Sequence, residues 1–190
     1  MKDDTGGGRR KPRVSRHDWL AKALEVLESE GVEAVHVERL AREIGVSKSG
    51  FYWHFRDRRD LLSNLLNYWA HEYTEVVTEN PLLRKSDPAQ RLENTMAMID
   101  RHDLAKFDLV VRAWAKKDEE ARAVVETVTD SRIQYIRQAF RDLGFEADEA
   151  EMRAALFVCY HTWEKTIFPK MSKRRRARLR KRRLVLLTSR

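Results

Sequence analysis

The sequence predicts an all-α fold, in which an N-terminal three-helix head containing a helix-turn-helix is joined by a long fourth helix to a helical body. Two observations support this prediction. Apolar residues recur at the spacing of a helix face along most of the chain, and no long stretch alternates between apolar and polar residues as strands do. In residues 37–59, VERLAREIGVSKSGFYWHFRDRR, two short helical patterns flank a glycine and a further helix begins after them.

The first helical pattern begins at Ser15 and ends at Gly31, because glycine commonly stops a helix in a left-handed conformation. The second runs from Val37 to Ile44. Gly45 follows as the turn residue, for which a positive φ is expected. We therefore expect a tight turn between the second and third helices.

The third helix is expected to run to about His54. Ser47 is expected to cap it by accepting a hydrogen bond from its orphan backbone N–H groups. Phe51 and Phe55 lie one helical turn apart and are expected to anchor the helix in the core of the head.

The fourth helix is expected to begin after Asp57 and to extend over about 20 residues, or ~30 Å. Asp57 caps it, and Asp60 adds a favourable negative charge to its first turn. Asn80 and Pro81 end it. Because this helix starts in the head and ends in the body, we expect it to couple the two mechanically.

The second half of the chain is helical by pattern throughout. Helices are expected to start at Asp87, at Asp118 and at Asp148, the last with a capping box that Glu151 completes. Residues 154–160 are apolar on every side, and such a helix must be buried on every side. We therefore expect it to lie between its own core and a second subunit.

The composition is that of a soluble, helix-rich globular protein, with 42% hydrophobic and 36% charged residues. No apolar run reaches the roughly 18 residues of a membrane span, and no signal-peptide pattern opens the chain. The single cysteine, Cys159, excludes an intramolecular disulfide and a cysteine-rich zinc site. We expect a cytoplasmic protein with no membrane partner, no metal and no cofactor.

The charge is spread unevenly along the chain. Residues 1–16 carry +4 and residues 170–190 carry +11, which leaves −7 for the residues between them in a chain whose total is +8. Two basic ends predict a polyanionic partner such as nucleic acid. The alternative is two solvated tails with no target, and we favour nucleic acid because the tails flank a helix-turn-helix.

The head resembles a known family of regulators. Leu40-Ala41, Gly45-Val46-Ser47-Lys48, Tyr52-Trp53-His54-Phe55 and Leu61-Leu62 stand at the spacing of the DNA-binding head of the TetR (tetracycline repressor) family. The resemblance spans roughly residues 15–62, and the body is only weakly similar. It implies a homodimeric transcriptional regulator that binds a pseudo-palindromic double-stranded DNA operator, and a repressor that a small apolar effector releases.

Composition and the resemblance together predict how the chain is divided. Residues 1–14 form a flexible basic arm, and residues 15–60 form the helix-turn-helix DNA-binding domain. Residues 61–168 form the helical ligand-binding and dimerisation domain, and residues 169–190 form a basic C-terminal tail.

In a helix-turn-helix, the second helix lies in the major groove with its first residues at the base edges. Lys48 can reach guanine acceptors or a phosphate, while Tyr52 and His54 are expected to bond phosphates. Trp53 is expected to be exposed, either against a sugar or thymine methyl or simply in solvent. The residues expected to contact DNA are Arg13, His36, Ser47, Lys48, Ser49, Gly50, Tyr52, Trp53, His54 and Arg58.

Some of these positions depart from the family pattern. His36 stands where the family often has threonine or serine, and Gly50 stands where it commonly has a DNA-contacting threonine. Arg58 replaces a lysine that contacts a phosphate, which keeps the charge and adds a forked donor. Sequence recognition is therefore expected to depend more on Lys48, on Trp53 and on the N-terminal arm, which can enter the minor groove.

The body carries aromatic and sulfur-containing residues that could line a cavity for an apolar effector. Ordinary core packing is the alternative, and we favour a cavity. His161 could line it or lie at a subunit interface, which we favour, and Cys159 is expected to be an inert buried thiol. The residues considered for the cavity are Met96, Met98, Phe107, Trp114, Phe157, Tyr160 and Trp163.

The basic stretch 171–183 has helix-favouring residues, but its own charge repulsion opposes folding. It could contact DNA, attach to an acidic patch of the body or of a partner subunit, or remain a free tail. We rank DNA contact below the other two, because in the family the C-terminus usually lies far from the DNA.

Other functions have weaker support. Residues 71–75, HEYTE, lack the second imidazole of a zinc-protease helix. No paired carboxylates, nucleophile elbow or glycine-rich phosphate loop indicates an enzyme. An architectural DNA-binding protein without an effector, which would use the basic ends for non-specific contact, remains the alternative to a regulator.

Overall fold

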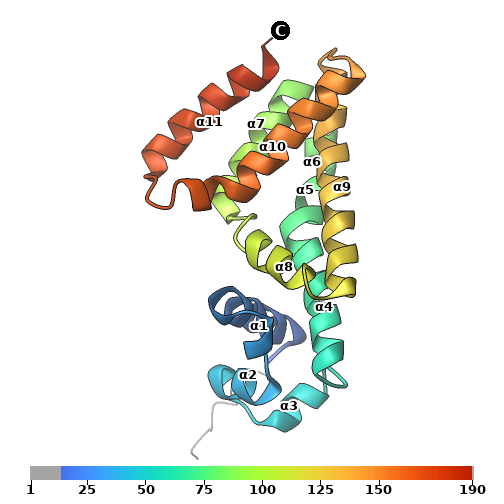
Figure 1. The fold of residues 1–190 in the computed structure, drawn as a ribbon, viewed down its shortest axis with the longest axis vertical. Helices are drawn as coiled ribbons and strands as arrows, with labels where there is room; N and C mark the ends of the chain where they lie inside the picture. Colours follow the sequence, from blue (N-terminus) through green and yellow to red (C-terminus); the bar gives the residue numbers. More distant parts are fainter. Residues whose placement is uncertain (1–13, 190) are drawn as a thin grey trace, which may run out of the picture.

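The computed structural model describes residues 14–189, and within this range the chain forms helices and no strand. Figure 1 shows a small head at one end of the molecule and a larger helical body at the other. The helix that begins as α4 runs out of the head and into the body beside α9. Arg13, which was expected to contact DNA, lies outside the described residues.

The head follows the predicted pattern. Ser15 and Asp18 form a reciprocal capping box at the start of the first helix, and Gly31 ends it with φ 84°. Gly45 adopts the left-handed conformation, with φ 80° and ψ 34°, and turns the chain between the second and third helices. The head elements are α1 (Arg16–Glu30), the short 3₁₀ turn η1 (Val32–Ala34), α2 (Val37–Ile44) and α3 (Lys48–Tyr52).

The third helix differs from its prediction in two respects. It ends at Tyr52 rather than at about His54. Ser47 stands at the N-cap, but within the described chain its hydroxyl makes no capping hydrogen bond and lies 2.7 Å from the hydroxyl of Ser49 instead. The predicted cap is therefore wrong, because a neighbouring side chain competes for the same oxygen.

The long fourth helix is confirmed, and it contains an irregular turn. It starts as α4 (Arg58–Ala70) after the predicted cap Asp57, continues through a π-helical turn, η2 (His71–Glu75), and finishes as α5 (Val76–Thr78). A π turn inserts an extra residue per turn and is frequently found at functional sites.

Glu79 is the C-cap of α5, and Asn80 caps the next helix. Asp87 caps its helix as predicted, and Asp118 is the N-cap of the helix that was expected to start there. The capping box at Asp148 is wrong, because Glu146 is the N-cap of this helix and Asp148 lies inside its first turn. The body helices are α6 (Pro81–Arg84), α7 (Pro88–His102), α8 (Asp108–Ala115), α9 (Glu119–Asp142), α10 (Ala147–Ile167) and α11 (Lys173–Thr188).

One hydrophobic core extends from the head into the body. It contains Trp19 of α1 and Phe51 of α3, continues through Trp69 of α4, and reaches Trp114 of α8 and Val128 of α9. Phe51 and Phe55 are buried in it, as predicted. The head is therefore packed against the first part of the body rather than hanging from a flexible linker.

Helix α10 presents two different apolar faces. Ala154 and Phe157 pack into the core of the body. The opposite face, which we call the α10 outer face, is exposed in the single chain and includes Trp163, which is 47% exposed. Cys159 lies on this face, so the prediction of a buried thiol is wrong. The α10 outer face consists of Met152, Leu156, Cys159, Trp163 and Ile167.

The basic C-terminal stretch forms helix α11, which lies against the body on the side away from α3 (Figure 1). Arg176 lies 3.1 Å from Glu164, and Arg180 lies 2.8 Å from Asp100. Attachment to acidic residues of the body was one of the three alternatives for residues 171–183. These ion pairs offset the repulsion among the basic side chains that opposes helix formation in this segment. Among residues 14–189, no helix is long and apolar enough to cross a membrane.

Candidate nucleic-acid interface and body cavity

The N-terminal half of α3 presents polar side chains to solvent. Ser47, Lys48 and Ser49 are exposed, and the aromatic side chains of Tyr52 and Trp53 are 61% and 77% exposed. The exposure of Trp53 confirms the prediction from sequence. Because Phe51 holds the other side of the helix in the core, this polar and aromatic face projects from the end of the head, where α3 lies in Figure 1.

Lys48 is paired with Glu38 of α2, a contact that was not predicted from the sequence. The hydrogen bond that Lys48 donates to this carboxylate raises the pKa of Lys48 above its ordinary value. Both side chains are exposed, and such surface pairs contribute little to stability. A phosphate or a guanine can therefore replace Glu38 as the partner of Lys48 at small cost.

Gly50 has room for a side chain. Among the described residues, no atom lies within 4 Å of the position that a Cβ would occupy, and its φ is not in the left-handed range. Neither packing nor backbone conformation requires glycine here. A Cβ at this position would meet no neighbouring part of the described chain.

Arg58 and His54 are held by backbone carbonyl groups of the head. Arg58 donates from Nε to the carbonyl oxygen of Val35 and from Nη2 to that of Val32, each at 2.7 Å. Nε2 of His54 lies 3.2 Å from the carbonyl oxygen of Val14. A phosphate contact by Arg58 would require breaking these bonds, so in the free protein this side chain ties α4 to η1.

His36 is the N-cap residue of α2 and is exposed. Within the described residues its side chain forms no capping hydrogen bond. The imidazole is therefore not committed to stabilising the start of α2.

Replacing Lys48 by alanine is expected to weaken operator binding by about 1–3 kcal/mol if Lys48 contacts a base. The loss should be largest for the preferred operator, so that discrimination between sequences at one position is relaxed. Titration of the wild type and the variant against the operator and single-base variants measures both effects.

The matched variant Glu38→Gln removes the partner of Lys48 without removing the ammonium group. It is expected to bind DNA more tightly, because it also removes a carboxylate beside the phosphates. If Lys48→Ala instead lowers the affinity for all DNA sequences equally and makes binding less dependent on salt, Lys48 contacts a phosphate. If Lys48→Ala leaves DNA affinity unchanged, Lys48 does not belong to the interface.

The body encloses an apolar cavity between the end of the long helix and helices α7 to α10. Its volume, measured as the space open to the centres of water molecules, is about 50 Å³. Of the residues considered from sequence, Phe157 lines it. Met96, Phe107 and Trp114 are buried in the core instead, Met98 and Tyr160 are partly buried outside this cavity, and Trp163 faces outward.

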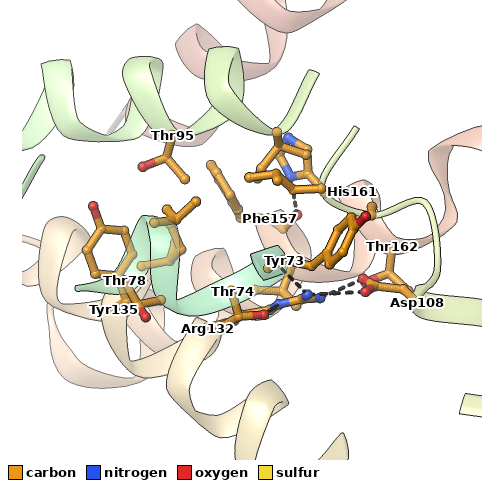
Figure 2. Close-up of a pocket in the computed structure, with 16 residues that line it drawn as sticks. Tyr73, Thr74, Thr78, Thr95, Asp108, Arg132, Tyr135, Phe157, His161 and Thr162 are labelled. Carbon is orange, nitrogen blue, oxygen red and sulfur yellow. Dashed lines mark hydrogen bonds and ion pairs between the residues drawn. The ribbon is translucent and has the colours of Figure 1, made fainter. Parts of the chain in front are cut away.

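A buried ion pair forms part of the cavity wall (Figure 2). Nη1 and Nη2 of Arg132 lie 2.5 Å and 3.1 Å from the carboxylate oxygens of Asp108, which is completely buried. Arg132 also donates to the hydroxyl of Thr74 at 2.9 Å and to the carbonyl oxygen of Tyr73 at 3.1 Å. The pair therefore connects α8 and α9 to the π turn of the long helix.

His161 also lines the cavity and is buried by its own chain, so its predicted place at a subunit interface is wrong. Its Nε2 lies 3.1 Å from Nη2 of Arg183, which can only donate, and its Nδ1 lies 2.8 Å from the carbonyl oxygen of Phe157. These contacts assign a neutral ring with the proton on Nδ1. Burial, followed by the charge of Arg183, lowers the pKa of His161 to about 3.

The polar residues of the cavity were not identified from sequence. Arg132 and Asp108 are 24 positions apart, and spacing cannot pair them. The one available signal is that Asp108 interrupts an apolar run, FDLVVRAWA, since a carboxylate in such a run is buried only with a partner. The missed polar residues include Tyr73, Thr74, Thr78, Thr95, Asp108, Arg132, Tyr135 and Thr162.

The cavity and the head share one helix. Tyr73 and Thr74 lie in η2, Val77 and Thr78 lie in α5, and all of them line the cavity. The same helix begins at Arg58 in the head. A molecule in the cavity would therefore touch the helix that carries the head.

Known proteins are similar to this chain in sequence. The model of the bacterial regulatory proteins of the tetR family matches residues 20–65. The tetracycline repressor protein class A from transposon 1721 of Escherichia coli is 42% identical over 145 residues, which are 75% of this chain and 61% of the repressor. Across the tetracycline repressors that it matches, the chain covers between 24% and 61% of their length.

Solved structures show the same fold along most of the chain. A transcriptional regulator from Rhodococcus sp. Rha1 superposes with a TM-score of 0.71 at 17% identity, covering 92% of this chain and 96% of the other. FadR from Bacillus subtilis, solved with stearoyl-CoA, gives 0.68 at 16% identity, covering 92% and 98%. The head of this chain therefore belongs to the tetR family of bacterial regulatory proteins, and the chain as a whole shares the fold of the solved regulators.

Proposed function

We propose that this protein is a homodimeric, sequence-specific DNA-binding transcriptional regulator, and that it is a repressor released by a small molecule. The observation that carries the proposal is the exposed face of α3, where Lys48 and Trp53 project from a rigid head. An α-helix fits the major groove, and its first residues then reach the base edges. The named relatives of the tetracycline repressor type support the same interpretation.

Dimerisation is supported by the α10 outer face. Met152, Leu156 and Ile167 are each more than half exposed in the single chain, and such an apolar patch marks an interaction site. A second copy is the natural occupant, because a twofold axis brings the same patch onto itself. The two α3 helices would then meet half-sites about 34–36 Å apart on a pseudo-palindromic operator.

Release by an effector is supported by the shared helix. A ligand that enlarges the cavity would press on the π turn and on the Arg132–Asp108 pair. A ligand shifts an equilibrium only as far as it binds one state more tightly than the other. The DNA-binding state is the one with the small cavity, and the ligand favours a state in which the long helix and its head are displaced.

Selecting bound sequences from a random DNA pool tests the proposal. A regulator yields one short palindrome whose half-sites are about one helical turn apart. An architectural protein, the alternative that the basic ends suggest, binds all sequences alike with a steep salt dependence. Enrichment of no sequence would overturn the proposal in favour of that alternative.

Leu156→Glu tests the dimer. Burying a carboxylate at the centre of an apolar interface is expected to weaken dimerisation by about 2 kcal/mol or more and to weaken operator binding with it. Leu82→Glu is the matched control, because Leu82 is an exposed leucine of α6 outside the α10 outer face. Sedimentation measures the mass of each variant. Dissociation by both variants or by neither would reject this interface.

A further inference from the structure

The cavity adjoins a second hollow of opposite chemistry. This hollow is a surface cleft, and its lining includes Arg84, Arg91 and Arg137. Its volume, measured in the same way as that of the cavity, is about 560 Å³. Thr78 and Tyr135 line both the cleft and the cavity. These two residues therefore form the wall that separates an apolar compartment from a basic one.

The cleft is lined by three arginines and one carboxylate, Asp142, and Arg84 and Arg137 retain free N–H donors. Arg84 donates from Nε to the carbonyl oxygen of Thr78 at 2.7 Å, and Arg137 donates from Nη1 to Glu151 at 2.7 Å. A guanidinium group has five N–H donors, so these bonds leave most of the donors available. Arg91 pairs with Asp142 at 3.0 Å, and within the described chain its buried Nε has no partner.

The wall between the compartments carries hydroxyl groups. Figure 2 shows Thr78, Thr95 and Tyr135 together at one end of the cavity, away from Asp108. Thr95 is almost fully buried and its hydroxyl interacts with that of Tyr135, but among residues 14–189 neither oxygen has a partner with full hydrogen-bonding geometry. Buried polar atoms are normally satisfied, so unsatisfied ones beside a cavity indicate a missing polar partner.

We propose, on the basis of the regulatory function above, that the effector is an amphiphilic anion, whose apolar tail occupies the cavity and whose carboxylate or phosphate binds in the Arg84–Arg91–Arg137 cleft. Arginine matches both headgroups with forked hydrogen bonds. The chain passes Thr78 and Tyr135, and the headgroup oxygens nearest this wall accept hydrogen bonds from the hydroxyls of Thr95 and Tyr135. A short tail suits the present cavity, and a longer one requires the long helix to move.

Calorimetric titration of the full-length protein tests this assignment with octanoate, octyl phosphate, octan-1-ol and inorganic phosphate as probes. Both octyl anions are expected to bind about tenfold or more tighter than octan-1-ol, since a hydrogen bond to a charged group contributes about 1.5–3 kcal/mol. The tighter of the two anions identifies the headgroup. Octan-1-ol binding as tightly as the anions would overturn the proposal, as would inorganic phosphate binding as tightly as octyl phosphate.

The double variant Arg84→Gln/Arg137→Gln locates the headgroup. It is expected to lower the affinity for the octyl anions about tenfold and to leave that for octan-1-ol unchanged, which also shows that the variant is folded. Lys85→Gln removes an exposed cation beside the cleft that does not line it, and is expected to change nothing. Equal anion binding by wild type and double variant would overturn the assignment.

Ile99→Phe locates the tail, because Ile99 lines the cavity and not the cleft. Filling the cavity is expected to weaken binding of every octyl probe. Because binding of the octyl probes is measured without DNA, the proposed effector site and the proposed regulatory function are tested independently. If octanoate or octyl phosphate binds as described but leaves operator affinity unchanged, the release mechanism fails and this site stands. If no octyl probe binds, this site fails and DNA recognition stands.

Discussion

Replacing Asp108 by asparagine is expected to lower the free energy of unfolding by about 3–5 kcal/mol. The asparagine side chain has nearly the same shape as that of aspartate, so the change removes the charge and little else. The guanidinium of Arg132, which is mostly buried, would lose the carboxylate that now lies 2.5 Å away. A buried charge without its counter-ion must either unfold its surroundings or draw in water. Urea denaturation at fixed protein concentration measures the change.

Two further variants separate the charge effect from a general effect of mutation. Glu151→Gln breaks the pair with Arg137, in which both side chains are about half exposed, and is expected to cost less than about 1 kcal/mol. Asp108→Leu combined with Arg132→Met removes both buried charges and is expected to recover much of the lost stability. Equal losses for Asp108→Asn and Glu151→Gln would show that the buried pair contributes no more than a surface pair.

The head was predictable from sequence because its signals are local. The glycine with positive φ at Gly45, the helix start at Ser15 and the pair Phe51 and Phe55 each depend on residues close together in the sequence. The cap of α3 that was wrongly predicted has an equally local cause, since the hydroxyl of Ser47 pairs with Ser49 rather than with the backbone. The spacing of apolar residues does not predict which hydrogen-bond partner a serine hydroxyl takes.

The cavity was not predictable, because periodicity reports burial and not what a side chain is buried against. Met96 and Phe107 are as buried as expected, but they touch other side chains rather than an empty space. Trp163 illustrates the complementary error. An apolar helix such as α10 has one face packed in its own core and another face exposed, and composition alone does not assign a residue to either.

The basic tail shows how long-range contacts overrule a local expectation. Repulsion among the arginines of residues 173–183 opposes a helix when the segment is considered alone. In the folded chain, Asp100 and Glu164 lie opposite Arg180 and Arg176, although they are distant from them in sequence. Arg183 is nearly buried, and its guanidinium carbon lies 3.9 Å from the ring centre of Tyr160. The partners of a charged segment are set by the fold.

Acidification is expected to destabilise the protein through His161. The ordinary histidine pKa of 6.5, which holds in the unfolded chain, falls to about 3 in the folded protein. Between these values the unfolded state binds the proton and the folded state does not, so stability is lost as pH falls. The expected loss between pH 6.5 and about pH 5 is about 1.5 kcal/mol. Protonation is opposed by burial and by the charges of Arg183 and Arg132.

His161→Gln isolates this contribution, because glutamine keeps a donor and an acceptor but does not titrate. Urea denaturation of both proteins from pH 7 to pH 5 should show a shallower dependence for the variant by about one proton. Asp18 and Asp60, whose pKa values are lowered, lose their contribution only at more acidic pH. His71 acts in the opposite direction, because Glu75 raises its pKa and the exposed pair strengthens as pH falls. These groups are common to both proteins and cancel in the difference. Parallel curves would therefore mean that His161 takes up its proton without leaving the fold, and that the cavity wall beside Arg183 opens to water.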